Sequence, residues 1–229
     1  MEETVIKKTG KNYFIKIIVV SVVIFFVVFG SLRIYRLLKT EGSTYTYEGA
    51  TGQFSFDIVE NNGLKQHVVR VYVFEDDGKE HEKVIPLRYG PKEMNEITVE
   101  KDIDNLVLLD LSKEDTLKDQ IYITQDPKLV EESQRDSIVA SLEIMKVVGD
   151  YSFGVYKIPI QMAYTSKGST NLPIITCKDT DNGKGVILLK YGGANRIYSE
   201  EGCVILEATT SEDIIKVADR LVLDLLGVF

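Results

Sequence analysis

The sequence has 229 residues, contains no tryptophan, and is poor in the residues that catalytic and metal sites use most, with two cysteines and two histidines. It contains no GxSxG, HExxH or SxxK pattern, so hydrolase and zinc-protease functions lack a nucleophile or a ligand set. A CxxC pair is also absent, as is an Asn-x-Ser/Thr acceptor for N-glycans. The sequence therefore predicts no catalytic residues and does not favour an enzyme.

The clearest feature that is present is an uncharged apolar run over residues 17–32, which residues 12–16 extend toward the N-terminus. About 20 helical residues span roughly 30 Å, the thickness of the hydrocarbon layer of a bilayer. A cleaved signal peptide is the alternative, but the run is long, rich in β-branched residues and phenylalanine, and lacks an Ala-x-Ala site. We predict a short cytoplasmic tail over residues 1–11 and a transmembrane anchor over residues 12–32.

The orientation of this anchor does not follow from its flanking charges, because four lysines precede the uncharged run and three cations follow it closely. The N-terminal tail is too short to form a domain, and both cysteines lie in the large C-terminal body. Export of that body would place them in an oxidising compartment. We therefore predict a single-pass protein of the cell membrane with its large C-terminal domain outside. A body that faces the cytoplasm, with reduced cysteines, is the alternative.

The body that follows the anchor is strongly acidic. From residue 40 onward there are 20 Lys and Arg against 33 Asp and Glu, a formal charge of −13. Nucleic acid would repel such a surface, so we predict no nucleic-acid partner, and membrane lipid is a partner only through the anchor. The body is long enough to bury a core without extra cross-links.

The first part of the body carries strand signals. Residues 33–52 have the composition of a linker, and residues 53–111 are predicted to form a β-rich subdomain with a hairpin turn over residues 76–79. Pro86 would place its strand at a sheet edge or at a bulge. The predicted strands cover residues 54–58, 69–73, 83–89, 97–99 and 106–111.

The second part, residues 112–229, is predicted to be α/β. A strand over residues 121–124 runs into Asp126-Pro127, which is a favourable helix start. That helix should reach about Val148 and bury three apolar residues at helical spacing, namely Ile138, Leu142 and Met145. Further strands are predicted over residues 172–177, 186–190 and 203–208.

The last helix has the most regular apolar stripe of the chain. Thr210 or Ser211 is predicted to cap it and Gly227 to end it. The connection before Val186 is too short for a parallel crossover and indicates a hairpin around Asn182-Gly183. The predicted class is therefore α/β with a mixed sheet, with α+β as the alternative. The predicted stripe consists of Ile214, Val217, Ala218, Leu221, Val222 and Leu225.

Four C-terminal segments resemble a group of uncharacterised membrane-anchored envelope proteins of archaea: LPIITCKD (172–179), GCVILE (202–207), DIIKVADRL (213–221) and LLGV (225–228). Two shorter segments, PLRYGPK (86–92) and TQDP (124–127), are lesser marks of the same group. The resemblance implies an archaeal cell-envelope setting and a paired role for the two cysteines. It implies no activity and no substrate.

Cys177 closes one predicted strand and Cys203 opens another. A disulfide across the 25 intervening residues would stabilise the fold by about 3 to 4 kcal/mol in the chain-entropy picture. The predicted exported setting favours this disulfide, and two buried free thiols are the alternative.

The two histidines are predicted to be surface strand residues. Pairing about the turn at residues 76–79 sets Phe74 opposite His81 and Arg88 opposite His67, which places the imidazoles roughly 23 Å apart. They cannot share a metal ion.

Acidic strand ends are a candidate cation site. Asp126, Asp179 and Asp181, together with Glu207, could gather around a divalent cation. The segment over residues 179–183 departs from a calcium loop in the position of its glycine, so an ordinary Asn-Gly turn and separate caps are preferred.

The loop over residues 190–196 is a candidate anion site. Gly192, Gly193 and Arg196 could hold an anion through backbone and side-chain donors. The loop lacks the spacing of a P-loop, and a hairpin loop without ligand explains it as well.

These observations predict a non-enzymatic envelope module that binds a partner protein or associates with itself. An anchored enzyme or solute-binding domain that uses a divalent cation is the alternative. No other cofactor is predicted.

Overall fold

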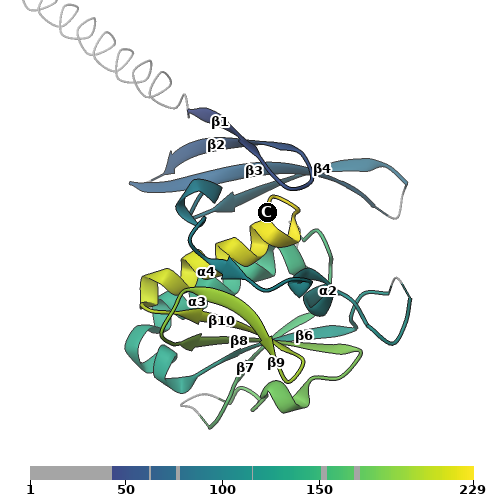
Figure 1. Ribbon diagram of the computed structural model, residues 1–229, viewed down its shortest axis with the longest axis vertical. Helices are drawn as coiled ribbons and strands as arrows, with labels where there is room; N and C mark the ends of the chain where they lie inside the picture. Colours follow the sequence, from purple (N-terminus) through teal and green to yellow (C-terminus); the bar gives the residue numbers. More distant parts are fainter. Residues whose placement is uncertain (1–42, 62, 76–77, 115, 151–153, 168–170) are drawn as a thin grey trace, which may run out of the picture. The chain divides into compact units, whose positions relative to one another are not determined.

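The computed structural model describes residues 43–229 apart from residues 62, 76–77, 115, 151–153 and 168–170 (Figure 1). The predicted tail and anchor, residues 1–32, and the first half of the predicted linker, residues 33–42, lie outside the described residues. Within the described part, no helix is long and apolar enough to cross a membrane. The described chain from Thr44 onward forms a single unit, Thr44–Phe229.

The first four strands form an antiparallel sheet in the order β1-β2-β3-β4. Pro86 lies in the edge strand β4, as predicted, where a missing N–H is tolerated. Because side chains alternate along each strand, one face is buried. That face contributes Phe56, Val69, Ile85 and Leu87 to the core. The strands are β1 Thr44–Glu48, β2 Gln53–Asn61, β3 Leu64–Phe74 and β4 Glu80–Leu87.

Two details of this sheet correct the sequence analysis. The chain enters the sheet at Thr44, inside the range predicted as linker, because the Thr-Tyr alternation of β1 pairs with β2. The register of β3 and β4 differs by one residue from the prediction, so that His67 lies opposite Leu87. His67 also shares the inward face of Val69 and is only 4% exposed, so the prediction of a surface histidine was wrong.

Three short elements follow the first sheet in the chain: η1 Pro91–Glu93, β5 Thr98–Val99 and α2 Ile103–Leu108. The predicted strand over residues 106–111 was wrong, because its first half belongs to α2, which buries Ile103 and Val107 four residues apart. A short apolar run has no period that separates a strand from a helix. Strand β5 pairs with β9 and so belongs to the second sheet.

The second sheet has six strands in the order β5-β9-β10-β8-β6-β7. Strands β7, β6, β8 and β10 run parallel to one another, and β9 pairs antiparallel with β10. The mixed α/β class is therefore confirmed. The strands are β6 Gln120–Gln125, β7 Ile160–Tyr164, β8 Lys184–Tyr191, β9 Arg196–Glu200 and β10 Cys203–Ala208.

The predicted hairpin around Asn182-Gly183 was wrong. Residues 172–177 do not form a strand of either sheet, and the chain makes the short helix η2 (Cys177–Asp179) before β8 begins. Strand β8 then pairs in parallel with β6. The sequence analysis also missed β9, which is short and largely polar and turns into β10 at Glu201-Gly202, where both residues have positive φ.

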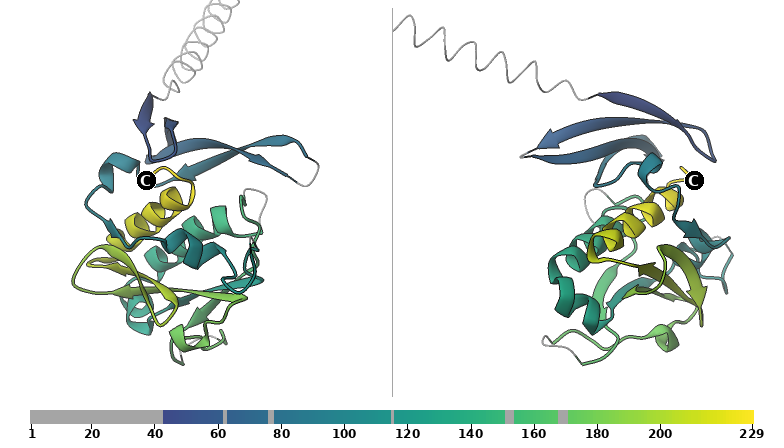
Figure 2. Two further views of the ribbon diagram at one scale, coloured as in Figure 1. Left: turned by 45° about the vertical axis from the view of Figure 1, so that its right-hand side comes forward. Right: turned by 60° about the vertical axis from the view of Figure 1, so that its left-hand side comes forward.

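Helices α3 (Pro127–Val148) and α4 (Ser211–Leu225) lie between the two sheets (Figures 1 and 2). Helix α3 begins and ends where predicted, but Ser133 (φ −156°, ψ 74°) is not helical and interrupts it with a kink. The Thr210 hydroxyl caps α4 by accepting a hydrogen bond from the Asp213 N–H over 3.1 Å, and Gly227 follows with φ of 75°. All six residues of the stripe predicted for α4 are buried. The main core joins both helices to the inner faces of both sheets.

Candidate binding groove

Helix α3 buries a different face from the one predicted. Ile138 and Leu142 are 45% and 49% exposed, and Met145 is half-buried. The face that is buried contains polar residues, so in the sequence it resembles a solvent-facing side. It consists of Ser137, Ala140, Ser141, Glu143, Ile144, Val147 and Val148.

The exposed stripe of α3 forms one side of a groove of about 390 Å³, and the edge strand β7 forms another side. Gln125 and Ser141 add polar groups that are almost fully buried. The Gln125 side-chain amide donates to the Ser141 hydroxyl over 2.8 Å, so these two polar groups already form a hydrogen bond with each other. We call this feature the α3–β7 groove. Its main apolar residues are Val130, Ile138, Leu142, Met145, Met162 and Leu172.

An extended segment over residues 172–175 lies beside β7 at one end of the groove. The Tyr164 N–H donates to the Pro173 carbonyl over 3.0 Å, and the Ile175 N–H donates to the Tyr164 carbonyl over 2.9 Å. On the neighbouring strand β6, the Thr124 hydroxyl donates to the Ile175 carbonyl over 2.8 Å. These bonds hold the segment that carries the groove residue Leu172.

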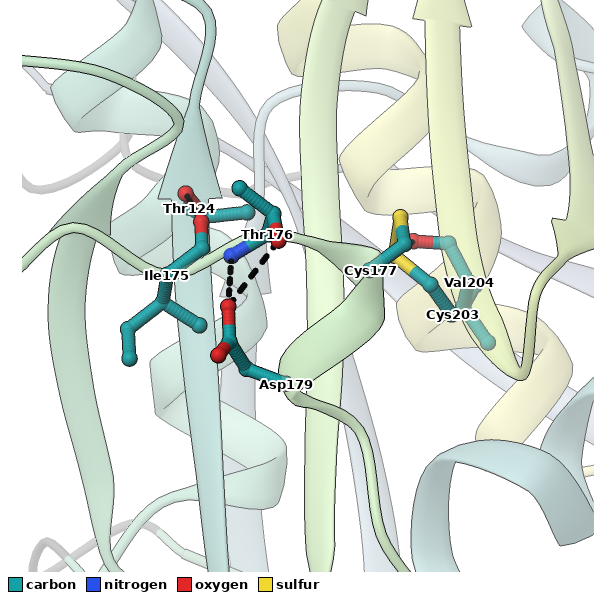
Figure 3. Close-up of a disulfide and its surroundings, with 7 residues drawn as sticks. All are labelled: Thr124, Ile175, Thr176, Cys177, Asp179, Cys203 and Val204. Carbon is teal, nitrogen blue, oxygen red and sulfur yellow. Dashed lines mark hydrogen bonds between the residues drawn. A yellow bond between two sulfur atoms is a disulfide. The ribbon is translucent and has the colours of Figure 1, made fainter.

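The predicted disulfide between Cys177 and Cys203 is confirmed, with a Cα–Cα distance of 5.0 Å (Figure 3). Cys177 begins η2, and the buried Cys203 begins β10. Cys203 packs with Val186 and Ile205 in a small apolar cluster that is separate from the main core, and Ile175 packs against this cluster. The disulfide therefore fastens the segment beside the groove to the sheet.

The three aspartates considered as metal ligands are not brought together. Asp126 follows the carboxyl end of β6, whereas Asp181 precedes the amino end of its parallel neighbour β8. Those two strand ends are roughly 17 Å apart. Asp179 accepts hydrogen bonds from the Thr176 N–H and hydroxyl, which lower the pKa of Asp179 (Figure 3). Among the described residues, no group of three or more His, Cys, Asp or Glu could hold a metal ion.

The loop considered as an anion site surrounds a carboxylate of the same chain, that of Glu207. The Gly193 N–H and an Arg196 guanidinium N–H each donate to this carboxylate over 3.0 Å, and the Tyr198 hydroxyl does the same. A Cβ at Gly192 would lie 2.1 Å from the Glu207 carboxyl carbon, so a side chain there would collide. Burial raises the pKa of Glu207, but the donors from Arg196 and Tyr198 outweigh it, and the net pKa is lowered.

His67 is a buried polar centre that the sequence analysis missed. Its Nδ1 lies 2.9 Å from the Tyr45 hydroxyl, and its Nε2 lies 3.0 Å from a Glu93 carboxylate oxygen without hydrogen-bond geometry. Burial lowers the pKa of His67 more than Glu93 raises it, which favours the neutral ring. Burial and Glu93 together raise the pKa of Tyr45 to about 12. The sequence contained one signal for this burial. His67 and Val69 are two residues apart in the same strand, so their side chains lie on the same face, and Val69 is buried.

Comparisons with known proteins assign no family, since no family model, curated protein or solved structure matches the chain. The resemblance to archaeal envelope proteins stays a prediction.

Proposed function

We propose that this protein is a single-pass membrane protein whose body, outside the cytoplasm, binds a segment of a partner protein in the α3–β7 groove. The groove is the observation that carries the proposal. It exposes large apolar side chains beside two buried polar groups, which is the composition of a binding site. The proposed role is binding rather than catalysis.

The apolar side chains of the groove are sufficient to support binding. Ile138 and Leu142 each leave almost half of their surface in water. Covering one such side chain contributes on the order of 1 kcal/mol. Because Met145, Met162 and Leu172 line the same groove, a partner that covers all of them gains the kind of apolar centre that dominates protein interfaces.

Three observations support a membrane anchor and a body outside the cytoplasm. Residues 12–32 have the length and apolarity of a membrane anchor. The Cys177–Cys203 disulfide is a bond that persists in oxidising compartments. The C-terminal segments resemble archaeal envelope proteins, and we include that setting in the proposal.

Photo-crosslinking in the cells that make the protein tests the binding role. A photo-reactive phenylalanine analogue at position 142 of the full chain is expected to yield a discrete adduct with another protein. The same analogue at position 111 is the matched control, because Leu111 is 65% exposed and does not line the groove. Equal adduct patterns at both positions, or none at either, would contradict the proposal, and an adduct with a second copy would reassign the groove to self-association.

Thiol labelling tests the location. With a membrane-impermeant reagent, intact cells are expected to show labelling of Cys177, the more accessible of the two cysteines, only after an external reductant has been added. Labelling that requires cell lysis would place the body in the cytoplasm and contradict that part of the proposal.

A further inference from the structure

The outer edge of β7 presents main-chain groups beside the groove. Strand β7 ends the six-stranded sheet, and the Pro159 carbonyl and Thr165 N–H bond to its inner neighbour β6. Successive residues of a strand direct their N–H and C=O to alternate sides, so those of Ile160, Met162 and Tyr164 point outward. Among the described residues, only Tyr164 of these three has a main-chain partner on that side.

The partner of Tyr164 demonstrates that this edge accepts an extended chain. Residues 173–175 pair with Tyr164 in parallel geometry, with one hydrogen bond to the Tyr164 N–H and one to the Tyr164 carbonyl. Met162, two residues earlier in β7, directs its N–H to the same side, and its side chain lines the groove. A strand added there would lie between β7 and the apolar stripe of α3.

The charge of the molecule favours basic residues in the incoming strand. The body carries a formal charge of −13 from residue 40 onward. Glu131 and Glu132 are both exposed, and they stand in the sequence between Val130 and Gln134, which line the groove. A segment with lysines or arginines beside its apolar residues is therefore complementary to this surface.

Building on the proposed function, we propose that the partner segment binds as an extended strand that pairs with Ile160 and Met162 of β7. Every second side chain of this strand is apolar and packs against Ile138 and Leu142, and basic residues flank it. In strand addition of this kind, main-chain hydrogen bonds supply affinity, and pockets for alternate side chains supply specificity.

A labelled synthetic peptide, Lys-Val-Thr-Val-Thr-Val-Lys, tests this with the full chain in detergent micelles by fluorescence anisotropy. Met162→Pro removes the outward N–H but leaves the bonds to β6, which come from the residues on either side of it. Met162→Ala removes the side chain and keeps the N–H. We expect Met162→Pro to weaken binding by at least about tenfold more than Met162→Ala does.

Two modified peptides make the test independent of how well the proline variant folds. In one peptide the Val amides are N-methylated, and in the other the Thr amides are. Only one of the two peptides therefore loses the N–H donors on the edge that faces β7. With the wild-type protein, one pattern is expected to abolish binding and the other to preserve it.

Equal binding of the two methylated peptides, or equal effects of Met162→Pro and Met162→Ala with native melting curves, would overturn strand pairing while leaving groove binding in place. Tighter binding of a helical peptide with the same apolar residues would overturn it as well. If the wild-type protein does not bind the parent peptide at millimolar concentration, this inference fails, and the crosslink at position 142 decides the proposed function separately.

Discussion

Helices α3 and α4 lie side by side between the same two sheets, yet their sequences predict their burial with opposite success (Figure 2). The stripe of α4 is entirely buried, whereas Ile138 and Leu142 of the α3 stripe are about half exposed. The buried face of α3 includes Ser141 and Glu143. An apolar stripe therefore does not by itself decide which face of a helix is buried, and a stripe that stays exposed points to a site with another role.

The polar partners of the two helices lie where they meet the four-stranded sheet. On α3, Lys146 Nζ is 2.6 Å from the Glu143 carboxylate and donates to the Pro86 carbonyl over 2.8 Å. On α4, the fully buried Asp219 accepts the Tyr89 N–H over 2.8 Å. Both helices thus hold the chain at the end of β4 through hydrogen bonds that no hydrophobic pattern records.

The largest effect is expected from truncating the α4 stripe. Leu221 is 0% exposed, and Leu221→Ala should lower the free energy of unfolding by about 4 kcal/mol, because it removes buried methyl groups and leaves a cavity. Urea unfolding followed by circular dichroism measures the change. A loss below about 1 kcal/mol would mean that α4 is not the better-packed helix.

The next largest effect is expected from removing the disulfide that holds the segment beside the α3–β7 groove. Replacing both cysteines, Cys177→Ala with Cys203→Ala, should lower the free energy of unfolding by about 3 kcal/mol, since the unfolded chain loses the closed loop that restricts it. Unfolding of the wild-type protein with and without a reductant checks the result. Equal midpoints in oxidised and reduced protein would contradict it.

Asp219 of α4 is expected to make the stability of the fold depend on pH. Burial, reinforced by Glu143, raises its pKa well above the ordinary value, although the Tyr89 N–H and Lys146 oppose the shift. When folding raises the pKa of a carboxyl group, the stabilising contribution of that group is fully present below about pH 4. As the pH rises from there toward the folded-state pKa, the free energy of unfolding falls by about 1.4 kcal/mol per pH unit. Asp219→Asn should therefore match the wild type near pH 4 and be more stable at pH 7.

The matched control for this prediction is Asp213 in the first turn of α4. Burial raises its pKa, but hydrogen bonds from Thr210 and Thr209 outweigh burial and lower it overall. This contribution is present above about pH 4 and lost below it, so Asp213→Asn should reduce stability at pH 7. Unfolding curves between pH 4 and 8 compare the two variants, and a shift of the same sign in both would contradict the assignment.

The smallest effect is expected on the exposed stripe of α3. Leu142→Ala should change the free energy of unfolding by less than about 1 kcal/mol, because the side chain is already half in water. Under the proposed function the same substitution weakens partner binding. A large loss of stability, measured as for Leu221→Ala, would show that α3 depends on this face for folding.

Much of the fold was predictable where the signal is local. Alternation identified β2 and β3, Pro86 marked an edge strand, and Thr210 and Gly227 marked the ends of α4. The disulfide was predicted from the expected exported location of the body and from the resemblance to archaeal envelope proteins. The segment over residues 172–177 was assigned wrongly, because an apolar run that covers a sheet and one that joins it have the same composition.

The candidate sites were less predictable. The loop with Gly192 and Arg196 was recognised as a cradle for an anion, but its anion, Glu207, lies on a different strand. His67 was assigned to the surface because no neighbour in the sequence indicates that Tyr45 and Glu93 enclose it. The groove was not predicted, since the α3 residues that form one side of it, Ile138, Leu142 and Met145, were predicted to be buried.

By itself the sequence determined the acidic charge of the body, the alternation of the first sheet and the one-sided stripe of α4, because each depends on residues that are close in the chain. Only the tertiary structure decided that β8 runs parallel to β6, that Glu207 fills its own loop, and that the α3 stripe faces an edge strand. Those outcomes depend on which distant segments pair, and no local period in the sequence carries that information.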